Sequence, residues 1–380
     1  MTIPNFCFRP QDGSKPPAFI IAEIGKNFIQ SEDERSVEEY LANAIALVKA
    51  AKEAGADAVK FQTHNVEDEQ ANIDVTSPHF KARDRYSWVS RNDRSTPLET
   101  FWKPLKKACD DMGIIFFSTP MSRGAAHKLA EVDPAIWKVG SGDILDFVML
   151  DYLRNSGKPI LISAGMSTLE EVDQSLAFLR EKTDQVVLLH CVSKYPCPPE
   201  ELSLNTIKFF QDRYQLPIGF SDHSITTASA IAAVALGARV VEKHFSLDRT
   251  LFGADHKVSL TPEEFAGLVQ GIRRVERDGE YAREVLEDEV VKRAMGTEAK
   301  VLDEGEAVFR PLFRKTLVAA MDLPVGTVLE PQHLYAMRPQ AHLAGRPSEG
   351  YTLVVGQRLT RPVKRFEPIA EDHTDPASSS

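Results

Sequence analysis

Short apolar runs alternate with helical patterns over the first three quarters of the chain. The runs are rich in Ile, Val and Phe and lack polar alternation, which is typical of strands buried on both faces of a parallel sheet. We predict eight strands, at Phe19–Ile24, Ala58–Phe61, Ile114–Ser118, Ile136–Val139, Pro159–Ser163, Val186–His190, Pro217–Phe220 and Arg239–His244. Because each strand leads into a helix, this order predicts an α/β fold, a (β/α)8 barrel. A doubly wound open sheet is the alternative, although its dinucleotide-binding form requires a Gly-x-Gly-x-x-Gly motif that is missing after the first strand.

Helical patterns fill the segments between the predicted strands. The clearest are Val37–Ala54, Leu98–Met112, Leu169–Leu179 and Thr226–Leu236. Ser36 with Glu39, and Thr168 with Glu171, have the spacing of helix N-terminal caps. Several of these helices are followed by glycine, which is a common C-terminal signal.

The pattern changes after the predicted barrel. Residues 273–300 are highly charged and helical, and from Glu306 onward short β-type runs are broken by Pro-Val-Gly and Glu-Pro. We therefore predict a catalytic barrel domain at 1–285, a linker at 286–305, a small β-rich domain at 306–370 and a disordered tail at 371–380.

Composition narrows the possible functions. The 380 residues include 45 Lys+Arg and 55 Asp+Glu, a net charge of -10 that argues against non-specific nucleic-acid binding. No apolar run approaches the roughly 18 residues of a transmembrane helix, and the first residues lack the apolar core of a signal peptide. The four cysteines, Cys7, Cys109, Cys191 and Cys197, lack a Cys-x-x-Cys spacing. We expect free thiols and a cytoplasmic location.

Most predicted strands carry a polar residue at or just beyond their carboxyl end, where a barrel has its active site. Two lysines and several hydroxyls among them predict an oxyanion pocket for phosphate or carboxylate. The strand-end residues are Glu23, Lys60, Gln62, Ser118, Thr119, Lys138, Ser141, Ser163, His190, Ser193, Tyr195, Ser221, Asp222, His223, Glu242 and His244.

Two histidines lie on neighbouring predicted strands. His223 and His244 suit a divalent transition metal, and a hydrogen-bonded core pair is the alternative. Their chain neighbours Asp222 and Glu242 would either orient the metal ligands or stabilise the barrel as ions. These residues predict a metal-assisted enzyme for a small phosphorylated or carboxylated substrate. A Schiff-base aldolase using Lys60 or Lys138 would have the same residues.

A set of short sequence motifs in a fixed order identifies a protein family more specifically than the composition does. The chain resembles the sialic acid synthase family, also called N-acetylneuraminate synthases, in IAEIGKN (21–27), AVKFQTH (58–64), FFSTPMS (116–122), KVGSGD (138–143), ISAGMST (162–168), LLHCVSKYPCP (188–198), GFSDHS (219–224) and VVEKHFSLDR (240–249). Residues 314–334, 337–339 and 354–359 resemble the antifreeze-like (SAF) domain of the same enzymes. The resemblance covers the chain from Phe19 to Ile369.

The resemblance implies a reaction. Phosphoenolpyruvate would condense with the open-chain aldehyde of an N-acylated aminosugar, giving a nine-carbon 2-keto-3-deoxy acid and phosphate. It implies that Glu23 acts as a general acid and base. It also implies that His223 and His244 bind a divalent ion, which would be manganese, with magnesium or cobalt as substitutes. The residues that it assigns to phosphoenolpyruvate are Lys60, Thr119, Lys138, Ser141, Ser163, Ser193 and Ser221.

The resemblance also implies a sugar site shared between two chains. Gln62, Asp143, Tyr195 and Asp255 match positions that contact the sugar. Arg338 matches an arginine that the SAF domain inserts into the other protomer's active site, which implies a domain-swapped homodimer.

Four departures from the family pattern are attributed to the sugar side. The chain has Phe28 for a usual His, Asp143 for Glu, Ala254 for Pro, and Gln340–Leu343 in place of a glycine-rich turn. Because misplaced polar groups discriminate strongly among substrates, we predict a retained donor and a changed acceptor. A diacetamido-trideoxyhexose leading to a legionaminic-type acid fits this prediction.

Three other functions stay open. The chain could be another phosphoenolpyruvate-aldose condensing enzyme with an octulosonate-type product, although the SAF-like region argues against it. It could be the Schiff-base aldolase named above. It could also be an inactive sugar-binding protein, although the complete set of charged strand-end residues argues against that reading.

Overall fold

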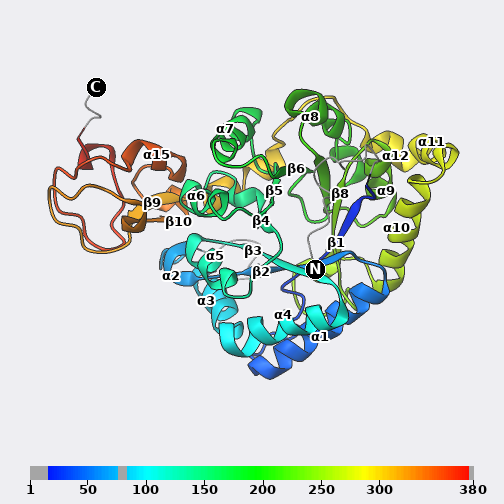
Figure 1. The fold of residues 1–380 in the computed structure, drawn as a ribbon, viewed down its shortest axis with the longest axis horizontal. Helices are drawn as coiled ribbons and strands as arrows, with labels where there is room; N and C mark the ends of the chain where they lie inside the picture. Colours follow the sequence, from blue (N-terminus) through cyan, green and yellow to red (C-terminus); the bar gives the residue numbers. More distant parts are fainter. Residues whose placement is uncertain (1–15, 76–83, 376–380) are drawn as a thin grey trace.

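Eight parallel strands close into a barrel in the computed structural model, which describes residues 16–75 and 84–375 (Figure 1). The open-sheet alternative is wrong, because β1 pairs with β8. The strands are β1 (Phe19–Gly25), β2 (Ala58–Thr63), β3 (Ile115–Pro120), β4 (Trp137–Val139), β5 (Ile160–Ser163), β6 (Val186–Cys191), β7 (Ile218–Asp222) and β8 (Val240–His244). The predicted barrel is confirmed, and all eight predicted strands are present with shifted ends.

Helices surround the barrel. They are α1 (Val37–Glu53), α2 (Val66–Glu69), α3 (Arg85–Ser95), α4 (Lys103–Met112), α5 (Arg123–Ala130), α6 (Phe147–Arg154), α7 (Leu169–Arg180), α8 (Thr206–Tyr214), α9 (Ala228–Ala235), α10 (Pro262–Val275), α11 (Gly279–Glu287) and α12 (Glu289–Ala294). Ser36 and Thr168 cap α1 and α7 as predicted. The predicted single helix 98–112 is divided: Leu98–Trp102 form a π-helical turn before α4, where Pro104 has no amide hydrogen for the helical ladder.

The hydrophobic core has two parts, one on each side of the strands. Inside the barrel, one small cluster of side chains includes Phe19, Ile21, Phe117, Leu161 and Val240. A much larger cluster fills the layer between the strands and the helices. Both faces of every strand are therefore apolar over most of their length, which explains the unbroken apolar runs in the sequence.

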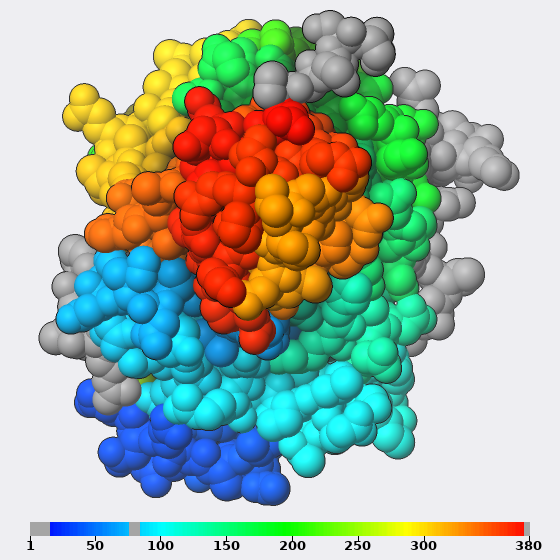
Figure 2. Space-filling view, turned by 90° about the vertical axis from the view of Figure 1, so that its left-hand side faces the viewer, coloured from blue at the N-terminus to red at the C-terminus, as the bar shows by residue number. Residues whose placement is uncertain are grey.

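The small domain contains an antiparallel pair, β9 (Thr316–Ala319) with β10 (Leu334–Met337), and several isolated β-bridges. Figure 2 shows this orange-to-red domain lying against the barrel. We expected a disordered tail at 371–380. Residues Glu371–His373 instead form a 3-10 turn, and the His373 carbonyl accepts from the Thr360 amide at 3.0 Å. Residues 376–380, like Cys7, lie outside the described residues.

The small domain packs against the barrel of its own chain. Arg123 of α5 donates to the carbonyls of Pro331 and Leu334 at 2.6 and 2.8 Å. The Ser348 hydroxyl donates to the Leu145 carbonyl at 2.7 Å, just before α6. Two short helices, α13 (Glu304–Ala307) and α14 (Arg310–Phe313), lead from the barrel into the domain. None of the helices formed by residues 16–75 and 84–375 is long and apolar enough to cross a membrane.

Candidate active site

A layer of polar side chains lies above the apolar cluster inside the barrel. In each strand, residues two positions apart point to the same face. Phe19 and Ile21 fill the interior, so Glu23 follows them on the same face of β1; Leu161 likewise precedes Ser163 on β5. The predicted strand-end chemistry is therefore concentrated at the carboxyl end of the barrel.

The centre of this layer is a buried group of three charges. Lys60 Nζ lies 2.6 Å from Glu23 Oε2 and 3.7 Å from Glu242 Oε2. Burial raises the pKa of Glu23 to about 7, although the charge of Lys60 opposes the shift. Burial disfavours a charged Lys60, but Glu23 and Glu242 outweigh it and raise its pKa. Lys60 therefore keeps its charge, and Glu23 can exchange a proton near neutral pH.

The residues predicted to bind phosphoenolpyruvate surround these charges. Lys60 donates to Thr119 Oγ1 at 3.0 Å, and Ser221 Oγ donates to Glu242 Oε1 at 3.0 Å. Lys138 donates to Ser163 Oγ at 2.7 Å. With two ammonium groups and several hydroxyls, this part of the site suits a multiply charged anion.

Ser141 and Ser193 meet this group at Gly165, in the loop after β5. A Cβ atom at Gly165 would lie 2.3 Å from Ser193 Oγ and 2.6 Å from Ser141 Oγ, so a side chain there would displace both hydroxyls. The fold thus brings all seven predicted donor-binding residues to one end of the barrel.

His223 and His244 lie side by side, with ring centroids 5.4 Å apart. His223 Nδ1 lies 2.8 Å from the Val192 carbonyl, which assigns the hydrogen to Nδ1 and leaves Nε2 as a lone-pair donor. Burial lowers the pKa of His244 to about 4, and its buried Nδ1 has no hydrogen-bond partner among the described residues. Burial by itself would lower the pKa of His223, but Cys191 and the Val192 carbonyl outweigh it and raise that pKa. Two imidazoles fit a divalent transition metal with its other positions open, and binding it would require the neutral form of His223. Among the described residues, no cluster of three or more His, Cys, Asp or Glu side chains is preformed.

Three of the predicted sugar-binding residues lie beside this centre. Gln62 donates to Glu23 Oε1 at 3.0 Å. The ring of Tyr195, which is 48% exposed, lies 4.1 Å from the ring of His223, centroid to centroid. Gly25, with a φ of +54°, provides the space here, since a Cβ on it would lie 3.1 Å from Glu23 Oε1 and 3.5 Å from Asp255 Oδ2.

The other two predicted sugar-binding residues form a buried ion pair. Asp143 pairs with Arg338 and, at 2.9 Å, with Lys315 Nζ, which also lies 2.7 Å from Asp146 Oδ2. Arg338 and Lys315 lower the pKa of Asp143, although burial opposes them. The resemblance implied that Arg338 enters the partner's active site. Within this chain it instead contacts its own barrel, because the small domain packs against α5 and α6.

One departure from the family pattern does not belong to the sugar side. The ring of Phe28 is 1% exposed and lies 5.0 to 6.2 Å from the rings of Tyr40, Phe61 and Phe101. The residue is thus part of the layer between barrel and helices, and its change is a matter of core packing. The Asp143 departure remains at the site.

Three of the strand-end residues point away from the site. Ser118 follows Phe117, which fills the barrel interior, and its hydroxyl lies 2.8 Å from that of Thr63. His190 faces the helices, where Nε2 lies 2.6 Å from the Leu202 carbonyl.

Asp222, the third of these residues, forms a fully buried pair with Lys243 at 2.6 Å. The two acids were expected either to orient the metal ligands or to stabilise the barrel. Asp222 stabilises the barrel, whereas Glu242 is one of the active-site charges.

Sequence reasoning missed Glu306. Its side chain is fully buried, and Oε1 accepts from the amides of Met166 and Ser193 at 2.9 and 2.7 Å. It comes from α13, more than one hundred residues after Ser193, and nothing in the local sequence signals the contact. Arg314 adds a bond to the Met166 carbonyl at 2.7 Å. The start of the small domain thereby holds the loops after β5 and β6.

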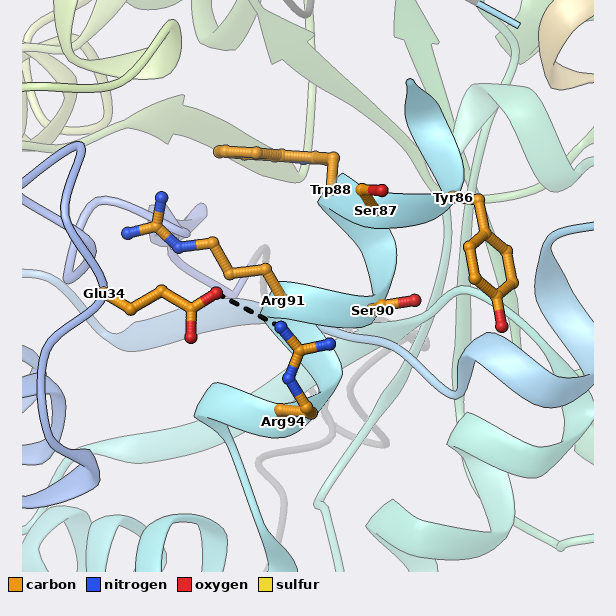
Figure 3. A pocket seen from close by; sticks show the side chains of 7 residues that line it. All are labelled: Glu34, Tyr86, Ser87, Trp88, Ser90, Arg91 and Arg94. Carbon is orange, nitrogen blue, oxygen red and sulfur yellow. Dashed lines mark hydrogen bonds and ion pairs between the residues drawn. The ribbon is translucent and has the colours of Figure 1, made fainter. Parts of the chain in front are cut away.

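Two surface pockets lie apart from this site. Figure 3 shows one of about 240 Å³ along α3, bordered by Trp88, Arg91 and the Glu34–Arg94 ion pair. A second lies along α5 and α6, near Arg123 and Tyr152. Neither contains a residue of the polar layer.

Comparisons with known proteins agree with this arrangement. The NeuB family model matches residues 47–282, and the SAF domain model matches residues 314–373. Human N-acetylneuraminate-9-phosphate synthase is 31% identical, over 96% of this chain and 94% of the relative. The N,N'-diacetyllegionaminic acid synthase of Legionella pneumophila is 31% identical, over 96% of both chains. The crystal structure of the spore coat polysaccharide biosynthesis protein SpsE of Bacillus subtilis superposes with a TM-score of 0.76 at 30% identity, covering 96% of this chain and 97% of that one.

Proposed function

Because the chain belongs to the NeuB family, we propose that it is a nonulosonic acid synthase. It condenses phosphoenolpyruvate with the open-chain aldehyde of an N-acylated aminosugar, and gives a nine-carbon 2-keto-3-deoxy acid and phosphate. The observation that carries this proposal is the group of Lys60, Lys138 and Glu23 at the carboxyl end of the barrel, surrounded by hydroxyls.

We assign the donor substrate to the lysine and hydroxyl groups. Lys60 and Lys138 neutralise its phosphate and carboxylate, and the hydroxyls of Thr119, Ser163 and Ser193 donate hydrogen bonds to them. Ser141 and Ser221 complete this set. All of these groups except Ser141 are buried, which excludes water from the charged donor and strengthens each interaction.

We assign proton transfer to Glu23. Carbon 3 of the enol attacks the aldehyde carbon, and the resulting alkoxide takes the proton of the Glu23 carboxyl. Water then adds to the oxocarbenium carbon and returns a proton to Glu23. The C2 hydroxyl then gives its proton to the departing phosphate as the bond between C2 and the phosphate oxygen breaks, which leaves the keto group. A pKa of about 7 suits both proton transfers.

His223 and His244 would hold a divalent ion, for which we propose manganese. When bound, it polarises the aldehyde oxygen and orients water. Treatment with chelator should abolish phosphate release, and added manganese should restore it. Magnesium and cobalt are the substitutes to compare.

We propose a modified aminosugar as the acceptor, such as a diacetamido-trideoxyhexose. Asp143 supports this proposal because its carboxylate is held by Arg338 and Lys315 and is one methylene shorter than the usual Glu. Gln62, Tyr195 and Asp255 would contact the same sugar on its other side. If N-acetylmannosamine proved the best acceptor of a broad panel, this part of the proposal would be wrong.

A homodimer and a cytoplasmic location complete the proposal. The family resemblance supports the first, and the three buried, unbridged cysteines among the described residues support the second. Light scattering of the purified protein tests the dimer. Mixing an Arg338→Ala variant with a Lys60→Ala variant should restore no activity if each small domain stays on its own barrel, because only exchanged domains would restore an intact site.

The deciding experiment is phosphate release from phosphoenolpyruvate with manganese, against a panel of N-acylated aminosugars, with mass analysis of the products. Release that needs both sugar and metal, with a product three carbons longer than the sugar, is the expected result. An octulosonate-type product would favour the other condensing enzymes. Trapping by borohydride on Lys138 would favour the Schiff-base aldolase, whereas Lys60 is disfavoured as its nucleophile by its ion pair with Glu23. Binding without turnover of any sugar would favour a sugar-binding protein.

A further inference from the structure

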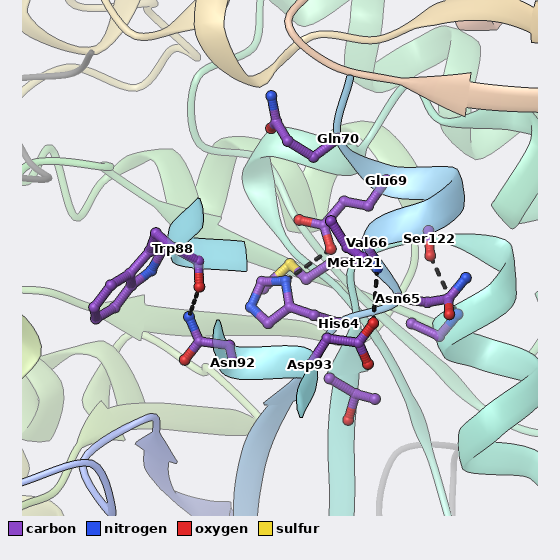
Figure 4. A network of polar contacts seen from close by, with 12 residues as sticks. His64, Asn65, Val66, Glu69, Gln70, Trp88, Asn92, Asp93, Met121 and Ser122 are labelled. Carbon is purple, nitrogen blue, oxygen red and sulfur yellow. Dashed lines mark hydrogen bonds and ion pairs between the residues drawn. The ribbon is translucent and has the colours of Figure 1, made fainter. Parts of the chain in front are cut away.

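A second buried pair of titratable groups lies just beyond β2, apart from the catalytic charges. His64 Nδ1 is 2.7 Å from Glu69 Oε2, and the two side chains are 3% and 0% exposed. Figure 4 shows the His64 ring turned toward Glu69 of α2, with Met121 close by. The mechanism proposed above uses neither residue.

The outer atoms of the pair have no hydrogen-bond partner in the part of the chain that the structure describes. His64 Nε2 and Glu69 Oε1 are both buried and accept no hydrogen bond within the described residues. Burial lowers the pKa of His64, so the ring is neutral and the carboxylate fixes its hydrogen on Nδ1. The pKa of Glu69 is lowered too, because His64 and Arg338 outweigh the effect of burial. Both outer atoms are therefore pure hydrogen-bond acceptors.

The pair lies at the sugar end of the site. Lys60, Gln62 and His64 follow one another at two-residue spacing along β2 and just past its end, so the series leads from the donor site through the sugar site to His64. On the other side, the Arg338 amide donates to the Glu69 carbonyl at 3.0 Å, and the Arg338 guanidinium pairs with Asp143. Two groups assigned to the sugar thus flank the pair.

We propose that His64 and Glu69 form a subsite for the acceptor sugar, which binds hydroxyl or amide N–H groups at the end of the sugar away from its aldehyde. This inference rests on the proposed function and narrows its substrate class. Two acceptor atoms, one of them on a carboxylate, bind hydrogen-bond donors and offer no hydrogen bond to a phosphate. The acceptor therefore carries a neutral donor group at this end.

The test removes a hydrogen-bonding group from the protein and, separately, a hydroxyl group from the sugar. His64→Asn keeps a nitrogen near the position of Nδ1 for Glu69 but removes Nε2, and Glu69→Gln removes the charge at Oε1. The acceptors are N-acetylmannosamine, its 4-deoxy and 6-deoxy analogues, its 6-phosphate and a 2,4-diacetamido sugar. We expect one deoxy change to raise the acceptor KM of the unaltered protein about tenfold. Loss of the same hydroxyl should raise the acceptor KM of the His64→Asn variant less than twofold. The KM for phosphoenolpyruvate should stay constant.

His190→Asn is the matched control. It removes another buried imidazole, but one that faces the helices, so it should lower stability without changing the preference among acceptors. Equal deoxy penalties in the unaltered protein and both variants would overturn the subsite, and so would a preference of the unaltered protein for the 6-phosphate. If His64→Asn does not fold, Glu69→Gln gives the same comparison. The failure of the proposed function would be recognised separately, because the unaltered protein would then release no phosphate with any acceptor.

Discussion

The contact between Glu306 and the loop that carries Ser193 predicts a specific defect in donor binding. In Glu306→Gln, an amide oxygen replaces the carboxylate oxygen that accepts from the amides of Met166 and Ser193. Both hydrogen bonds remain possible, but each loses its charge assistance, which is about 1 kcal/mol per bond. A loss of ~2 kcal/mol, if it all appears as displacement of Ser193, raises the KM for phosphoenolpyruvate about 30-fold.

The assay is phosphate release at varied phosphoenolpyruvate and saturating acceptor, then the reverse. The KM for the acceptor should rise less than the KM for phosphoenolpyruvate, because Glu306 bonds the Ser193 amide directly whereas Tyr195 lies two residues further along the loop. Glu304→Gln, an exposed change on the same α13 helix, should leave both KM values as they are. Equal increases in the two KM values, or an unchanged KM for phosphoenolpyruvate in a folded variant, would refute the reasoning.

Two further predictions concern buried charges in the barrel. Burial raises the pKa of Glu23 to about 7, and we assign Glu23 as the proton donor, so kcat/KM should fall as the pH rises through about 7. The residual activity of Glu23→Gln should not show this fall. A fall at the same pH in the variant contradicts the assignment. Lys243→Met leaves Asp222 as a buried charge without its partner, which should cost about 3–5 kcal/mol in the free energy of unfolding. Denaturant titration measures this loss, and the double variant with Asp222→Leu should recover most of it.

Most of the barrel could be predicted from local patterns. The eight apolar runs, the caps at Ser36 and Thr168 and the break before the small domain depend on neighbouring residues, so they are legible in the sequence. The Phe28 departure was assigned to the sugar side, but the aromatic ring lies in the core. Its position in a motif beside Glu23 did not indicate which way the ring points, because the chain turns between the two residues.

Partners that are far apart in the chain could not be predicted. Glu306 reaches Ser193, Arg338 pairs with Asp143, and His64 has Arg338 as a neighbour only after the small domain packs on the barrel. A buried carboxylate and a solvated one look alike in a sequence. Burial and pairing, which set their pKa values and their chemistry, are properties of the folded chain.

The sequence by itself determined the number and order of the strands and the kinds of chemical groups at their carboxyl ends, because hydrophobic patterns and strand polarity are local. Only the tertiary structure decided which groups work together. Glu242 enters the barrel beside Lys60, whereas the next residue, Lys243, points outward to Asp222. A strand buried on both faces carries no polar alternation to mark its inner side, so closure of the barrel makes that choice.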